Sequence, residues 1–415
     1  MSIKTKLTIL NFLEFFVFGA WLLSFGKYMH DTLGFKGEEI GFVFMTLGFA
    51  SLIMPGVMGV IADKWMSANK LFGFSHIAGA FLLVWLAQQS NFEGVFWVTL
   101  LYLMFYMPSI ALDNTISYCL LVKNNYDVVK DFPPIRVWGT VGFIIATWIT
   151  DLMGWGTSHM QFYFAAAVSL LLGIYTFTLP DCPPDKSTRK TLAQSFGIDA
   201  LKLFKNKQMA LFFIFSMLLG AALQITNMWG EAFLHDFGKI AEYKDAFIVK
   251  YNGVVMSLSQ ISETVFILTI PFFLKRYGIK TVMLMSMFAW FLRFGLFAVG
   301  TPAGIGAAAI ILSMIVYGMA FDFFNISGSL YVEKEVSAKI RASAQGLFMI
   351  MTNGIGAMMG ALLSGWVVDL YREGDHVNWQ SVWTVFAIYS LAVAILFAFS
   401  FKYKHNPEEE FEVAH

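Results

Sequence analysis

Residues 180–208, PDCPPDKSTRKTLAQSFGIDALKLFKNKQ, form the only long polar stretch inside a chain of 415 residues. Three prolines stand at its start, and apolar runs fill the sequence on both sides. A membrane-spanning helix needs about 20 mostly apolar residues, and these runs have about that length. Six spans are predicted before the stretch, over 7–29, 40–61, 71–88, 94–120, 135–154 and 161–179. Six more are predicted after it, over 210–233, 251–274, 281–299, 303–325, 343–368 and 380–401.

This pattern predicts an all-α integral membrane protein with twelve transmembrane helices in two six-helix bundles. We expect an N-terminal bundle over 1–179, a cytoplasmic central loop over 180–209, a C-terminal bundle over 210–401 and a cytoplasmic tail over 402–415. If the N-terminus lies in the cytoplasm, most of the 28 lysines and arginines fall on the cytoplasmic side, as the positive-inside rule requires. Both termini are therefore expected in the cytoplasm, in a multi-pass protein of the inner membrane.

The composition excludes several classes of protein. The chain is 58% hydrophobic and only 13% charged, with a mean hydropathy of +0.65, whereas a soluble chain has about 25% charged residues. A soluble enzyme is therefore ruled out. The 28 basic and 28 acidic residues balance, so no basic surface for nucleic acid is expected. The two cysteines, Cys119 and Cys182, make no disulfide framework.

A short charged loop follows the second predicted span. Asp63 and Lys64 lie in the segment GVIADKW at residues 59–65, and Arg276 lies at the matching place after the eighth span. An acid at a helix end beside basic residues can hold neighbouring helices together, and a rocking carrier needs such a contact to break in each cycle. We interpret Asp63, Lys64 and Arg276 as a gating loop. The alternative is an ordinary charged loop that obeys the positive-inside rule.

An ionisable residue inside a predicted span is costly and is by default a functional candidate, and six stand out: Glu14, Asp113, Arg136, Glu263, Arg293 and Asp322. Arg136 cannot lose its proton, so it needs an acid or a substrate acceptor. Glu14 or Asp113 could be a fixed charge partner within the N-terminal half. Alternatively, Asp322 could meet Arg136 in one state and bind a proton in another. Arg293 suits a structural role, with Glu263 on the neighbouring helix as its candidate partner.

Polar and aromatic residues recur at helical spacing on several spans. Residues three, four or seven apart share one face of a helix. This spacing groups Arg136, Thr140 and Phe143; Gln224 and Asn227; Gln260 and Glu263; and Tyr317 and Phe321 beside Asp322. A single polar residue of this kind usually joins two helices, with a contact worth about 0.6 kcal/mol on average. Stripes on at least four helices favour a shared aqueous cavity, whose amides and acids suit sugar hydroxyls and whose rings suit a planar base.

Longer segments are specific enough to compare with known families: DFPPIRVWGT at 131–140, QITN at 224–227, SQISE at 259–263, YGMAFDFFN at 317–325, VEKEV at 332–336 and IRASAQG at 340–346. Together they resemble the nucleoside:proton symporter family of the major facilitator superfamily, almost from end to end. The resemblance implies that fold and proton-driven uptake of purine and pyrimidine nucleosides such as uridine and adenosine. It implies a substrate site between the two halves, H⁺ as the coupling ion, and no further cofactor or metal. The expected form is a monomer in the lipid bilayer.

The same resemblance assigns roles to individual residues. It implies nucleoside contacts at Arg136, Thr140, Phe143, Gln224, Asn227, Gln260, Glu263, Tyr317 and Phe321, and it implies proton coupling at Asp322. Asp113 lies outside the family's pattern, so it either alters the coupling or neutralises Arg136. The role of Glu14 stays open, because an acid or an amide would fit its position.

Other functions are consistent with parts of the pattern. A proton-coupled sugar or oligosaccharide symporter would need similar acids, an arginine and aromatic rings, and the long segments favour nucleosides over it. A membrane sensor without transport would be expected to carry an added signalling domain, for which the central loop and the tail are too short. A membrane enzyme is not expected, because the chain has no metal-binding spacing, nucleophile elbow or phosphate-binding loop.

Overall fold

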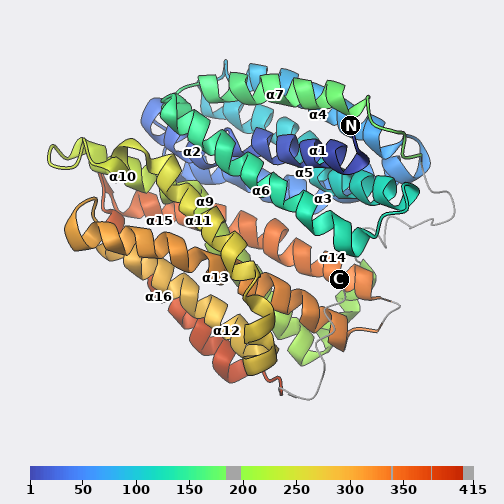
Figure 1. Ribbon diagram of the computed structural model, residues 1–415. Helices are drawn as coiled ribbons and strands as arrows, with labels where there is room; N and C mark the ends of the chain where they lie inside the picture. Colours follow the sequence, from blue (N-terminus) through green and yellow to red (C-terminus); the bar gives the residue numbers. More distant parts are fainter. Residues whose placement is uncertain (184–197, 338–339, 375, 405–415) are drawn as a thin grey trace. The chain divides into compact units, whose positions relative to one another are not determined.

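The structure, a computed structural model, describes residues 1–183, 198–337, 340–374 and 376–404. Within these residues the chain is almost entirely helical. It divides into two compact units (Figure 1). Of the described residues, unit 1 comprises 1–35 and 42–183, and unit 2 comprises 36–41, 198–337, 340–374 and 376–404.

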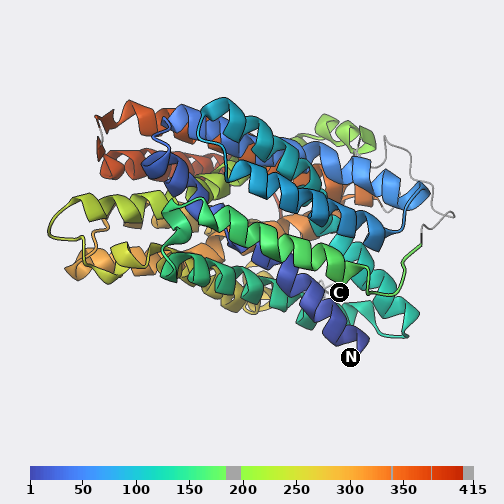
Figure 2. The same cartoon turned by 90° about the horizontal axis from the view of Figure 1, so that it is seen from above.

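Unit 1 begins with α1 (Ile3–Gly19), which leads into α2 (Leu22–Lys27) and a π-helical turn at Tyr28–Thr32. The helices that follow are α3 (Gly37–Lys64), α4 (Ala68–Leu86), α5 (Phe92–Lys123), α6 (Val128–Leu152) and α7 (Met160–Thr176), with a 3₁₀ turn at Trp155–Thr157. Helix α1 packs against α5, α6 and α7, while α4 packs against α5 and α7. Figure 2 shows these helices running broadly along one direction, so α1 is surrounded by other helices of the unit.

Unit 2 opens with a 3₁₀ segment at Ile198–Lys205 and the long α9 (Lys207–Asp236). A 3₁₀ turn at Phe237–Lys239 follows, and then α10 (Phe247–Lys250), α11 (Asn252–Ile267), α12 (Ile270–Val299), α13 (Gly304–Glu335), α14 (Arg341–Met349), a π-helical turn at Ile350–Gly356, α15 (Ala357–Leu370) and α16 (Trp379–Ser400). A two-stranded hairpin, β1 (Arg372–Glu373) and β2 (His376–Val377), joins the last two helices. Helix α13 packs against both α11 and α12.

Polar residues just before the apolar runs set several helix starts. The Asn91 side chain accepts a hydrogen bond from Gly94 N at 2.9 Å at the start of α5. The Asn206 side chain accepts one from Gln208 N, also at 2.9 Å, at the start of α9. Such caps satisfy backbone N–H groups that have no partner inside the helix. The sequence therefore marks these helix starts locally.

Glycines allow the first long helix of each unit to pack closely on a partner. A Cβ at Gly142 of α6 would lie 2.1 Å from Phe12 O of α1. In unit 2, a Cβ at Gly220 of α9 would lie 2.0 Å from Thr352 O. Small residues bring helix backbones together in membranes, where van der Waals packing drives helix association. Close packing at a glycine therefore joins α1 to α6. It also joins α9 to the π-helical turn at Ile350–Gly356, which precedes α15.

The eighth predicted span, 251–274, is not one helix. Helix α11 ends at Ile267, and α12 begins at Ile270 with Pro271 in its first turn, where the missing N–H of proline is tolerated. Within α12 the backbone leaves the helical conformation at Gly278, which has φ 75°. Among the described residues, ten helices are long and apolar enough to cross a membrane, and the apolar helix Met160–Thr176 is shorter.

The two cysteines are joined in the structure, which corrects the expectation that they contribute no disulfide. Cys119 lies near the end of α5, Cys182 follows α7, and their Cα atoms lie 6.3 Å apart. Asn69 Oδ1 accepts a hydrogen bond from Cys182 N at 3.0 Å. Contacts between the start of α4 and the segment after α7 therefore place Cys182 beside α5, a proximity that spacing along the chain does not reveal.

Candidate functional site

The α6 candidates in unit 1 are supported by α1. Arg136, Thr140 and Phe143 are all half-buried. The Arg136 guanidinium carbon lies 3.9 Å from the centroid of the Phe15 ring, a cation–π contact. The Phe143 ring stands edge-on to Phe18, with the ring centroids 6.2 Å apart. Two rings of α1 therefore contact Arg136 and Phe143, the first and last of the three candidates on α6.

The acids Glu14 and Asp113, which were candidate partners of Arg136, are completely buried in unit 1. Glu14 Oε2 lies 2.7 Å from His76 Nε2, and Asp113 Oδ1 accepts a hydrogen bond from Asn11 Nδ2 at 3.2 Å. Asp113 is also within electrostatic range of Arg136. The expectation that Glu14 serves Arg136 as its charge partner therefore needs correction, because α4 supplies a histidine that the sequence reasoning missed. Its signal was available: His76 is an ionisable residue inside the third predicted span.

The candidates of unit 2 lie on three helices. Helix α9 carries the buried Gln224 and the half-buried Asn227, and α11 carries the half-buried Gln260 and Glu263. Helix α13 carries the remaining three, which are Tyr317, Phe321 and Asp322. Packing of α11 on both α9 and α13 brings the three helices together. The residues that the sequence grouped by helical spacing therefore belong to neighbouring helices of one unit.

The α13 candidates combine two rings and an acid. The Tyr317 and Phe321 rings are nearly parallel at 15°, with centroids 6.5 Å apart. Asp322 is only 4% exposed. Glu263 of α11 is within electrostatic range of both Tyr317 and Asp322. The two acids therefore influence each other, so a proton taken up by one lowers the repulsion that the other feels.

Arg293 of α12 is fully buried beside these residues and makes contacts on three other helices. It donates hydrogen bonds to Ser313 O at 2.8 Å, Ser259 Oγ at 3.3 Å and Thr226 Oγ1 at 3.4 Å. Its guanidinium carbon lies 4.5 Å from the centroid of the Tyr317 ring. The expected pairing with Glu263 is wrong, because these contacts use hydroxyl and carbonyl oxygens. Arg293 ties α9, α11 and α13 together next to the candidate residues.

The gating-loop candidates are only partly described. Asp63 and Lys64 are the last residues of α3, and their side chains lie outside the described part of the structure. Arg276 is exposed, with its guanidinium carbon 5.7 Å from the centroid of the neighbouring Tyr277 ring. Arg276 lies within α12, just before the break at Gly278.

Several buried polar atoms of unit 2 have no hydrogen-bond partner among the described residues, and three of them belong to candidate residues: Gln224 Nε2, Gln260 Oε1 and Asp322 Oδ2. They belong to α9, α11 and α13, respectively. Buried polar groups are normally hydrogen-bonded, so each such group needs an explanation. An amide nitrogen, an amide oxygen and a carboxyl oxygen together can both donate to and accept from a polyhydroxylated ligand.

The chain matches one family and several known proteins along nearly its whole length. The family model described as nucleoside H⁺ symporter matches residues 1–406. The xanthosine permease of Escherichia coli (strain K12) is 52% identical over 410 residues, covering 99% of this chain and 98% of that protein. The nucleoside permease NupG of the same strain is 53% identical over 406 residues, covering 98% and 97%. A crystal structure of the nucleoside transporter NupG matches with a TM-score of 0.93 at 52% identity, covering 97% of this chain and 100% of that chain.

Proposed function

Because the chain belongs to the nucleoside H⁺ symporter family and takes up nucleosides together with protons, we propose which of its residues bind the nucleoside and which carries the proton. It is a multi-pass membrane transporter with a major facilitator-like helical fold, and it is not an enzyme. The proposed substrates are purine and pyrimidine nucleosides, including adenosine and uridine. The nearly equal identity to a xanthosine permease and to the nucleoside permease NupG supports this breadth.

The proposed nucleoside contacts come from both units. In unit 1 they are Arg136, Thr140 and Phe143, and in unit 2 they are Gln224, Asn227, Gln260, Glu263, Tyr317 and Phe321. The observation that carries the proposal is the set of unpaired buried atoms on α9, α11 and α13. Ribose hydroxyls can both donate and accept hydrogen bonds, so they can satisfy the two amides. The parallel rings of α13 offer flat faces for the base.

Asp322 is proposed to carry the coupled proton. It is buried, and its Oδ2 atom has no hydrogen-bond partner among the described residues. It also follows Phe321 directly on α13 and lies within electrostatic range of Glu263. A protonated carboxyl is much cheaper to bury than a carboxylate. Substrate bound at the neighbouring residues can therefore change which protonation state is favoured, which is what coupling requires.

The proposed topology has twelve spans, with both termini in the cytoplasm and one copy of the chain as the working unit. The ten long apolar helices, together with α7 and α11, would be these twelve spans. The bundles would cover 1–179 and 210–401, joined by the loop at 180–209 and followed by the tail at 402–415. Asp63, Lys64 and Arg276 are proposed as the loop residues that latch and release neighbouring helices during the cycle.

The test is uptake of labelled uridine into proteoliposomes under an imposed inward proton gradient. We expect uridine to accumulate, and excess unlabelled adenosine to compete with it while lactose does not. Asp322→Asn mimics the permanently protonated acid, so accumulation and uridine-induced proton movement should be lost while exchange of labelled for unlabelled uridine survives. Asp245→Asn, at an exposed acid of the same unit, is the matched control.

Two outcomes would contradict the proposal. If lactose competes with uridine as well as adenosine does, the assignment of nucleosides as the substrates is wrong. If Asp322→Asn concentrates uridine as well as the parent protein does, with normal proton movement, Asp322 is not the coupling residue.

A further inference from the structure

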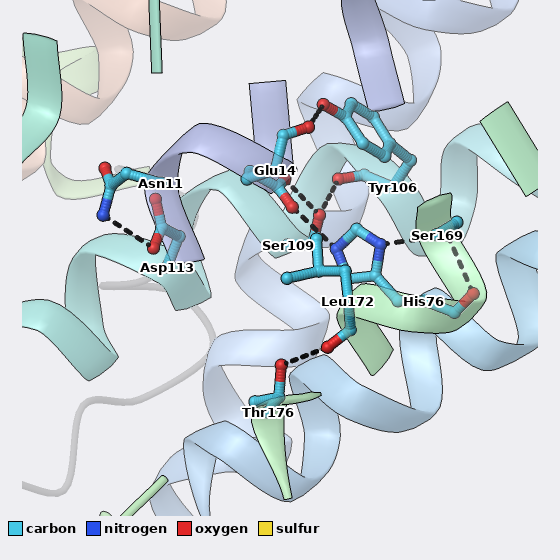
Figure 3. Close-up of polar contacts among 9 residues, drawn as sticks. All are labelled: Asn11, Glu14, His76, Tyr106, Ser109, Asp113, Ser169, Leu172 and Thr176. Carbon is cyan, nitrogen blue, oxygen red and sulfur yellow. Dashed lines mark hydrogen bonds and ion pairs between the residues drawn. The ribbon is translucent and has the colours of Figure 1, made fainter. Parts of the chain in front are cut away.

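A second acid with a proton-binding partner lies buried in unit 1, away from the residues to which a role has been given. Glu14 of α1 and His76 of α4 are 0% and 2% exposed, and the atoms Glu14 Oε2 and His76 Nε2 lie 2.7 Å apart. Ser109 Oγ of α5 donates a hydrogen bond to Glu14 Oε1, also at 2.7 Å. Figure 3 shows the two side chains pointing toward each other, with Ser109 and Ser169 on either side.

The hydrogen bonds of Ser169 determine the state of the imidazole. Ser169 Oγ donates its single proton to the backbone oxygen of His76 at 2.9 Å. The contact of 3.1 Å between Ser169 Oγ and His76 Nδ1 is then satisfied only if Nδ1 carries a proton and donates. With Nδ1 occupied, the contact between His76 Nε2 and Glu14 Oε2 needs one proton between them. That proton belongs either to a neutral carboxylic acid or to an imidazolium facing a carboxylate.

Both of these arrangements have no net charge. The pair does carry a net charge when it holds one proton fewer or one proton more. Without the proton, a buried carboxylate would face an imidazole lone pair. With a second proton, a buried imidazolium would face a neutral acid. A buried charge without a partner is strongly destabilising. One shared proton is therefore the state that this environment favours.

The surroundings of the pair contain other titratable groups, but none takes the place of His76. Helix α5 supplies Tyr102, Tyr106 and Asp113, each within electrostatic range of Glu14. Helix α6 supplies Arg136, which interacts electrostatically with Tyr106 and Asp113. Helix α7 contributes the Ser169 hydroxyl. Among the described residues, only His76 has an imidazole that contacts the Glu14 carboxyl and can hold or release a proton there.

Helix α1 connects this pair to the proposed nucleoside site. Tyr106 OH donates a hydrogen bond to the backbone oxygen of Glu14 at 2.9 Å, and its ring stacks on Phe18 with the centroids 5.0 Å apart. Phe18 contacts Phe143, and Phe15, next to Glu14 in the chain, lies under Arg136. Glu14 therefore holds this part of α1 in place, through its side chain to His76 and Ser109 and through its backbone to Tyr106. The same part of α1 contacts Arg136 and Phe143 of α6.

We propose that Glu14 and His76 form a second proton-binding site, whose single retained proton positions α1 and, through it, Arg136 and Phe143 for nucleoside binding. The proton at this site is distinct from the transported one assigned to Asp322. Glu14 and His76 are positioning residues, and the inference rests on the proposed nucleoside contacts of α6.

The test is the pH dependence of uridine binding by purified protein. His76→Phe removes the base and keeps a ring of similar shape against Phe72, whose centroid lies 4.4 Å from that of His76. Glu14 must then hold a proton alone, and rising pH removes it. The ratio of the variant's Kd to the parent's should therefore rise with pH, approaching about tenfold per pH unit once Glu14 ionises. Taking the ratio cancels the titration of Asp322 and Glu263, which both proteins share.

Two further variants sharpen the result. In the double variant Glu14→Gln with His76→Phe no acid remains, so its Kd ratio should not change with pH. His159→Phe, at an exposed histidine of the same unit, is the matched control and should give a constant ratio near one. If His76→Phe fails to fold, His76→Gln makes the same test, because an amide cannot take the proton.

The outcomes separate this inference from the proposed function. A Kd ratio for His76→Phe that stays constant with pH would show that the pair shares no proton. The Glu14→Gln variant could instead bind and exchange uridine but fail to concentrate it. That result would mean that the pair carries the transported proton, and it would overturn the positioning role. Failure of the parent protein to bind uridine would instead count against the proposed function.

Discussion

Replacing Arg293 with lysine should damage the protein more than replacing it with methionine, although lysine keeps the charge. The guanidinium makes three hydrogen bonds to three helices and lies 4.5 Å from the centroid of the Tyr317 ring. A lysine ammonium is a compact point charge that lacks the planar, forked arrangement of N–H donors in arginine. It can therefore form only some of these hydrogen bonds. Methionine cannot replace the hydrogen bonds either, but it leaves no charge in a fully buried position.

The contacts set the size of the two effects. Hydrogen bonds between membrane helices are worth about 0.6 kcal/mol each on average, so the loss of three in Arg293→Met should cost about 2 kcal/mol. A buried polar group left without its hydrogen bonds costs about 1–3 kcal/mol, and more when it is charged, so we expect a loss of about 3 kcal/mol or more for Arg293→Lys. Uridine affinity should fall in the same order, because Thr226, Ser259 and Tyr317 lie beside or among the proposed nucleoside contacts.

Equilibrium unfolding in mixed micelles and binding of labelled uridine provide the two measurements. Lys244, which is exposed and has no proposed role, serves as the control position. Its change to arginine or methionine should alter the unfolding free energy by no more than about 0.5 kcal/mol. A lysine variant at Arg293 that is as stable as the parent, or more stable than the methionine variant, would refute the reasoning.

Three further predictions follow from single contacts. Gln260→Ala and Glu263→Ala should each weaken uridine binding by about 5- to 150-fold, the equivalent of about 1–3 kcal/mol for an unsatisfied polar partner. Glu263→Gln should weaken binding less, and unchanged binding in both alanine variants would make these residues structural. Gly142→Ala should lower the unfolding free energy because its Cβ would meet Phe12 O, whereas Gly59→Ala, with no atom within 4 Å, should be neutral or stabilising. After denaturation in SDS, Cys182 should react with maleimide in Cys119→Ser, as seen by mass spectrometry, while labelling of Cys182 in the denatured, non-reduced parent would argue against the pairing.

Most helices could be predicted because their signals are local. The apolar runs and the caps at Asn91 and Asn206 lie within short stretches of sequence, so the predicted spans 94–120 and 210–233 lie within α5 and α9 to a few residues at each end. Helix α13 continues to Glu335, beyond the predicted end at residue 325. The exception at 251–274 has a local cause too, because Pro271 marks the first turn of a new helix. Hydropathy alone did not detect it, because the residues on both sides of the break are equally apolar.

The amino-acid sequence is sufficient to identify a helical membrane protein, the residues that share a helical face, and the family. Apolar runs and periodicity along one helix give the first two, and long matching segments give the third. The partners of the buried charges come from the packing of the helices: Glu14 pairs with His76 and not with Arg136, and Arg293 bonds to Ser259, Ser313 and Thr226 and not to Glu263. The physical reason is that a buried polar group bonds to whatever the neighbouring helix presents at its depth. Those partners come from distant parts of the chain, as with Ser109, which is 95 residues from Glu14.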